Sequence, residues 1–264
     1  MPFPETPRVV YRRNPLAEVV CQLKYPPVLA ISTKDPADFQ ERIRGDYPYY
    51  FRHSGFGIPP QVSELLASLQ IPGSVESVRH SFATEDKPEN PSKEVVLSRD
   101  FLAISDRKYQ RWETFSANLE TARKALEAIY RPAFYARVGL RYVDFVRPSD
   151  LGLQGEEWFE LFRPELVGAF REPIISRNVT EFVTTMTLRV PEIKGGLMRI
   201  NHGLKSDEGP EKIAYVIDVD IFTEQRSEPQ HVNHILDAFH KHAGNFFRWS
   251  ITPRLRDALD PERL

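Results

Sequence analysis

Apolar and polar residues alternate along several stretches of the chain, which is the pattern of strands that bury one face. The first stretch, LAEVVCQLKY, places Val19, Cys21 and Leu23 on one face and Gln22 and Lys24 on the other. The same alternation predicts further strands at residues 78–85, 94–105, 134–146, 178–190, 196–204 and 212–222.

Two long helices are predicted from apolar residues that recur at helical spacing. The first covers residues 111–131, where Trp112, Phe115 and Leu119 fall on one stripe. The second covers residues 229–249, which carry a similar stripe. Shorter helices are predicted at residues 36–44, 156–162 and 252–259.

The order of the predicted elements repeats along the chain. A strand, a short helix, several strands and a long helix occur in residues 1–132 and again in residues 133–264. We therefore predict two related β-α-β-β(-β)-α halves within one continuous domain, the first with an N-terminal arm and the second with C-terminal helices. Strands with one apolar face and few crossover helices favour an α+β fold, with a largely antiparallel sheet covered by long helices.

Composition and charge exclude several classes of protein. The chain has 264 residues and a net charge of −2, so no extended nucleic-acid-binding surface is expected. It contains no stretch of about 18 apolar residues, so we expect no membrane span. Its start lacks an apolar signal core, which leads us to expect a cytoplasmic protein. The single cysteine, Cys21, excludes a disulfide framework and a cysteine-rich zinc module.

Charged and polar residues occupy the polar positions of the strands predicted in the second half. Side chains two residues apart on a strand point to the same face. If these strands are neighbours, their polar side chains share one uncovered face of mixed charge. The residues concerned are Arg137, Arg141, Glu181, Arg189, Arg199, Asn201, Asp218 and Asp220.

Three interpretations of this face stay open. Arginine side chains suit phosphate and carboxylate groups, so the face is a candidate pocket for a small anionic ligand such as a nucleotide. It is equally a candidate surface for a protein partner. The third interpretation is a solvent-exposed sheet face held together by ion pairs between neighbouring strands.

The Asp218-x-Asp220 pair carries an alternative hypothesis, a metal-dependent phosphodiester or phosphoryl enzyme. Two carboxylates on one strand face can hold a divalent metal ion, and Glu181 is the candidate third ligand. This chemistry requires the three carboxylates to lie within about 5 Å of one another. The Gly-Ser turn typical of nucleotidyltransferases is missing upstream, and no nucleotide-binding or nucleophile-elbow motif occurs, so no cofactor is expected.

Residues 46–77 are rich in aromatic residues, proline and glycine, and are predicted to form a long irregular loop. Aromatic residues cluster at residues 47–56, and Tyr49 and Tyr50 are the candidate binding residues among them. Such a cluster forms the loop's own small core, contacts a protein partner, or stacks on nucleic-acid bases.

Five sequence blocks occur in a fixed order along the chain: NPLAEVVCQLKYPP, W-E-T-F, RVGLRYVDFV, VIDVDIF and ILDAFHKHAGNFFRWSITPRLRD. Together they resemble a sporadically distributed bacterial family whose chains have about this length and no established activity. The resemblance implies a role in a mobile gene cassette, such as a toxin–antitoxin or phage-defence locus. We therefore expect a non-enzymatic binding protein for a protein partner or a small anionic ligand, and the sequence leaves its oligomeric state open.

Overall fold

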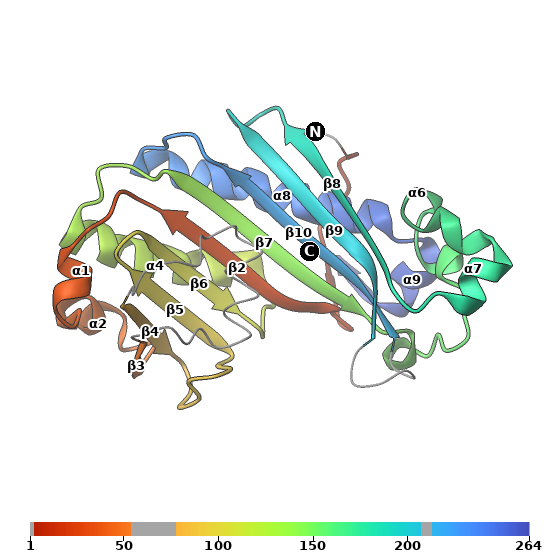
Figure 1. The fold of residues 1–264 in the computed structure, drawn as a ribbon, viewed down its shortest axis with the longest axis horizontal. Helices are drawn as coiled ribbons and strands as arrows, with labels where there is room; N and C mark the ends of the chain where they lie inside the picture. Colours follow the sequence, from red (N-terminus) through yellow and green to blue (C-terminus); the bar gives the residue numbers. More distant parts are fainter. Residues whose placement is uncertain (1–2, 54–77, 207–212, 264) are drawn as a thin grey trace. The chain divides into compact units, whose positions relative to one another are not determined.

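The computed structural model describes residues 3–53, 78–206 and 213–263 of the chain. The chain forms two compact units, which we describe separately (Figure 1). The first-half unit consists of residues 18–140 and 224–233, and the second-half unit of residues 1–17, 141–223 and 234–264.

Five strands of the first-half unit follow one another in the hydrogen-bonded order β3-β4-β5-β6-β2. The predicted apolar face of β2 is confirmed, because Val19, Cys21 and Leu23 are completely buried. The prediction of a polar opposite face is wrong, since Val20 and Gln22 are each only 1% exposed. The strands are β2 (Leu16–Lys24), β3 (Tyr49–His53), β4 (Arg79–Ala83), β5 (Lys93–Ser98) and β6 (Phe101–Asp106).

Helix α4 is the long helix of this unit, and its predicted apolar stripe is confirmed. Phe115, Leu119 and Leu126 are at most 3% exposed. The helix ends where Arg131 adopts a left-handed conformation, with φ of 48°, directly before Pro132, which cannot continue a helix. The helices of this unit are α1 (Ala30–Thr33), α2 (Ala37–Ile43) and α4 (Trp112–Tyr130), and η3 (Pro229–His231) is a short 3-10 helix.

Strand β3 corrects the prediction of an irregular loop at residues 46–77. Residues 49–53 pair with β4 in antiparallel register, with Tyr50 opposite Phe82. The sequence Tyr-Tyr-Phe-Arg-His does not alternate between apolar and polar residues, so the period-2 pattern misses it, although aromatic residues favour strands. The remainder of the predicted loop, including Phe56, lies outside the described residues.

The larger strands of the second-half unit have the order β7-β10-β9-β8. They are β7 (Arg137–Val146), whose first four residues belong to the first-half unit, β8 (Phe182–Val190), β9 (Gly196–Ser206) and β10 (Ile213–Thr223). Short helices connect β7 to β8: η1 (Pro148–Leu151), α5 (Trp158–Leu161), α6 (Pro164–Val167), η2 (Gly168–Arg171) and α7 (Pro173–Asn178).

A small two-stranded ribbon joins segments near the two ends of the chain. Strand β1 (Val9–Tyr11) pairs antiparallel with β11 (Pro261–Arg263), so Val9 faces Arg263 and Tyr11 faces Pro261. The long helix α8 (Val232–Ser250) and the short helix α9 (Pro253–Ala258) precede β11. None of the described helices is long and apolar enough to cross a membrane.

The sheet of the second-half unit has one buried face and one open face. On β10, Tyr215, Ile217 and Ile221 are completely buried. Helix α8 covers this side of the sheet (Figure 1). The Tyr142 hydroxyl of β7 lies 2.9 Å from Nδ1 of His240 on α8. The intervening residues of the same strands point the opposite way, to what we call the open face.

The two units repeat one order of elements. In each, a first strand is followed by short helices, then by several antiparallel strands and a long helix. In each, the first strand also pairs beside the last one, β2 beside β6 and β7 beside β10. Each unit combines helices with antiparallel strands, and the predicted α+β fold is confirmed.

Candidate functional site

The register of β8, β9 and β10 places most of the predicted polar residues on the open face. Asp218 lies opposite Asn201, and Asp220 lies opposite Arg199. On the other side of β9, Thr185 faces Asn201 and Thr187 faces Arg199. The strands that carry these residues are therefore neighbours, so their polar side chains share one face of the sheet.

Arg141 of β7 and Asp218 of β10 form a bidentate ion pair on this face. Nε of Arg141 donates to Oδ1 of Asp218 over 2.7 Å, and Nη2 donates to Oδ2 over 2.9 Å. The two side chains are only 13% and 14% exposed, so water screens the pair weakly. Each side chain thus neutralises the charge of the other. This pair agrees with the interpretation of a sheet face held together by ion pairs between neighbouring strands.

Other polar side chains of the open face also contact their neighbours. The Arg199 guanidinium carbon lies 5.6 Å from the centroid of the Phe222 ring, a cation–π distance. The Thr185 hydroxyl donates to Oδ1 of Asn201 over 2.8 Å. Asp220 shares this face by register, but its predicted exposure is wrong, because it is only 4% exposed and its carboxylate is unavailable to a large ligand.

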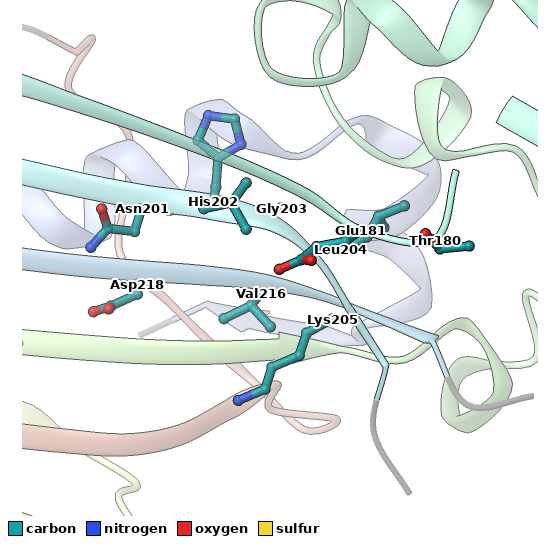
Figure 2. Close-up of a pocket in the computed structure, with 10 residues that line it drawn as sticks. Thr180, Glu181, Asn201, His202, Gly203, Leu204, Lys205, Val216 and Asp218 are labelled. Carbon is teal, nitrogen blue, oxygen red and sulfur yellow. The ribbon is translucent and has the colours of Figure 1, made fainter. Parts of the chain in front are cut away.

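A hollow of about 430 Å³ opens on this face, where β8, β9 and β10 run side by side. Its floor is apolar and consists of Val183, Gly203 and Val216. Figure 2 shows Asn201 and Asp218 at one end of the hollow and Thr180 and Glu181 at the other, with Lys205 below them. The hollow therefore combines an apolar floor with a polar rim.

Gly203 keeps the floor of the hollow low. A Cβ atom at this position would lie 1.7 Å from the carbonyl oxygen of Phe182 and 3.0 Å from Cα of Val183. Both are backbone atoms of the β8 edge, so no side-chain rotation could relieve the overlap. Only glycine allows β8 and β9 to approach this closely.

The three carboxylates of the metal hypothesis do not converge. Phe182 lies opposite Leu204, whereas Asp218 lies opposite Asn201, so Glu181 is at least three strand positions, roughly 10 Å, from the aspartates. In the part of the chain that the structure describes, no three His, Cys, Asp or Glu residues form a group that could hold a metal ion. The geometry that this alternative requires is therefore missing there.

The prediction that Arg137 lies on an uncovered surface is wrong. The residue belongs to the first-half unit and is 3% exposed. Its Nη1 donates to Oε1 of Gln22 over 3.2 Å. The guanidinium lies directly over Gly139, where a Cβ atom would come within 2.1 Å of Nη1. The missing side chain of Gly139 thus leaves the space in which Arg137 is buried.

Tyr49 and Tyr50 point to opposite faces of β3. The Tyr50 hydroxyl lies 3.1 Å from Oδ1 of Asp35 and 2.9 Å from Nδ1 of His80, and its ring stacks on the His80 ring. Desolvation and the bond to Asp35 raise the pKa of Tyr50 to about 12. Tyr49 is 40% exposed. Tyr50 therefore packs within its own unit, and Tyr49 alone of the pair presents a large surface to solvent.

Asp144 is a buried acid that the sequence analysis missed. It is 7% exposed, and desolvation together with the negative charge of Asp218 raises its pKa to about 8. The signal in the sequence is its register, because it occupies the apolar positions of β7, in line with Leu140, Tyr142 and Val146. Acidic residues are seldom buried, so an aspartate at an apolar position of a strand indicates an unusual environment, whereas an aspartate at a polar position does not.

Comparisons with known proteins do not assign this chain to a family. A scan against protein-family models finds no match, and a search of the curated proteins finds none either. The resemblance to the sporadically distributed bacterial family therefore stays a prediction.

Proposed function

We propose that this chain is a protein-binding module, and that its partner sits on the open face of the second-half unit and places an apolar side chain in the hollow. The observation that carries this proposal is the apolar floor surrounded by polar groups. Val183, at the edge of the floor, is 65% exposed. An apolar centre inside a polar rim is the usual anatomy of a protein–protein interface.

The charges around the hollow favour a protein over a small anion. Arg141 is neutralised by Asp218, and Arg199 packs over Phe222. With Asp218 paired to Arg141, the charges that remain on the rim are the Glu181 carboxylate and the Lys205 ammonium group, which are opposite in sign. A small anion in the hollow would therefore meet no excess of positive charge, whereas a protein side chain with apolar atoms meets the floor.

Filling the hollow tests this proposal. Val216→Arg places a long side chain over the floor, while Val96→Arg makes the same change at another half-buried valine, on β5 of the first-half unit. We expect a tagged wild-type chain and V96R to recover the same stoichiometric protein from cells of the source organism. Recovery with V216R should fall at least about tenfold, since the centre of an interface dominates its affinity.

The outcome is read by mass spectrometry of the eluate and by the native mass of the complex. Circular dichroism of both variants shows that each is folded before the comparison is made. Equal recovery with V216R and the wild type would contradict the proposal. So would a lone protein that retains a small anion.

A further inference from the structure

Strand β8 is the last strand of the sheet on its side, and no described strand pairs with its outer edge. It is nine residues long and contains no proline or glycine. Edge strands are usually protected by prolines, bulges or inward-pointing charges, because their unpaired backbone groups can pair with another chain. The sequence FVTTMTLRV lacks these features. An unprotected edge of this length is suited to pairing with a further strand.

Two opposite charges flank the middle of this edge at equal spacing. Glu181 precedes β8, Arg189 is near its end, and Thr185 lies midway between them. All three point to the open face and are exposed. Neither Glu181 nor Arg189 forms an ion pair with any described residue. The edge therefore carries one negative and one positive charge at equal distances from Thr185.

Antiparallel pairing of two identical copies of this edge makes these charges complementary. With a twofold axis at Thr185, Glu181 of each copy lies opposite Arg189 of the other, and Val183 lies opposite Thr187. On the other face the same register pairs Phe182 with Leu188. Shifting the register by two residues would place Arg189 opposite Val183 or opposite a residue before Glu181, and both ion pairs would be lost.

We propose that two copies of this chain pair antiparallel along β8, about a twofold axis at Thr185, with two Glu181–Arg189 ion pairs. Main-chain hydrogen bonds and burial of the exposed Val183 supply the affinity. The exposed ion pairs fix the register and exclude other pairings. An isologous contact of this kind closes on itself, so it yields a dimer and not a fibre.

The dimer adds a residue of the second copy to the hollow. Glu181 lines the hollow of one copy, and Arg189 of the second copy lies opposite it. The proposal goes beyond the protein-binding function and does not rest on it, because Val216→Arg fills the hollow and leaves the edge of β8 unchanged.

Charge reversal tests the register. The wild-type chain is expected to run in native mass spectrometry and sedimentation at twice its mass of 30.5 kDa. Glu181→Arg and Arg189→Glu should each raise the dissociation constant at least about tenfold, and the double variant should restore it. Arg177→Glu, at an exposed arginine of α7, is the matched control and should leave the dissociation constant unchanged. A monomer at all concentrations, or a dimer that ignores both single reversals, would overturn the proposal.

A cysteine at the axis tests the same geometry covalently. Residues directly opposite each other in an antiparallel pair have Cα atoms about 4.5–5.5 Å apart, within the range of a disulfide bond. Thr185→Cys should therefore form a covalent dimer on mild oxidation. Thr187→Cys should not, since it faces Val183 of the second copy, and the native Cys21 is completely buried. Equal cross-linking of the two variants would overturn the proposed axis.

Discussion

Arg141 and Asp218 join neighbouring strands of the second-half unit through two parallel hydrogen bonds, 2.7 Å and 2.9 Å long. The two residues are 77 positions apart in the sequence. Because both side chains are mostly buried, removing one of them would leave a charge without its partner.

We predict that Arg141→Ala lowers the free energy of unfolding by about 3 kcal/mol, the usual cost of breaking a buried pair from one side. The double variant R141M/D218L should lose much less, because an apolar pair of similar volume leaves no unpaired charge. Urea unfolding of the single and double variants measures the difference. A small loss in R141A that simply adds to the loss in Asp218→Leu would show that the pair contributes nothing.

Asp144 predicts an unusual dependence of stability on pH. Its pKa is about 8 in the folded chain, against an ordinary value of 3.8. Between these values the folded state keeps a proton that the unfolded state releases, so stability falls as the pH rises. The loss is about 1.4 kcal/mol for each pH unit in that window. Asp144→Asn should remove this loss and stabilise the chain most at the upper end of the window.

The measurement is denaturant unfolding of wild type and D144N from pH 5 to pH 8. Burial lowers the pKa values of His80, His202 and His242, so these groups act in the opposite direction and destabilise the fold as the pH falls through about 6.5. Both proteins contain them, and the difference between the two curves therefore isolates Asp144. Parallel curves would contradict the prediction.

Adding a single methyl group at Gly203 is expected to lower the stability of the fold. Gly203→Ala would place its Cβ against the Phe182 carbonyl oxygen, and we expect β8 to shift at a cost of about 1–3 kcal/mol. The matched control is Gly45→Ala, because a Cβ atom at Gly45 meets nothing within 4 Å. Thermal unfolding compares the two, and equal melting temperatures would argue against the close approach of the strands.

The alternation of apolar and polar residues predicts which side chains share a face of a strand. This prediction succeeds for the strands of the second-half unit. It places Asn201, Asp218 and Asp220 on one face, and the register agrees. It does not predict which residues face each other across strands. The pairing of Arg141 with Asp218 depends on a register that is set only when distant segments fold together.

Two of the wrong predictions from the sequence fail for different reasons: the exposure of Arg137 and the irregular loop that includes Tyr50. Arg137 sits in a polar register, but its burial depends on the space over Gly139 and on Gln22, which is 115 positions away. Tyr50 belongs to a strand that the period misses, because both faces of that strand carry aromatic side chains. Local pattern therefore predicts the elements, while contacts between distant segments decide which polar groups stay exposed.

The ribbon of β1 and β11 also has a mechanical consequence. Val9 faces Arg263 and Tyr11 faces Pro261, so the two strands separate from one end like a zipper when residues 9 and 263 are pulled apart. The hydrogen bonds of the ribbon would then break one after another, because the force acts on one bond at a time. The ribbon should therefore open at low force. Only after it has opened does tension reach the long strands, which lie further along the chain.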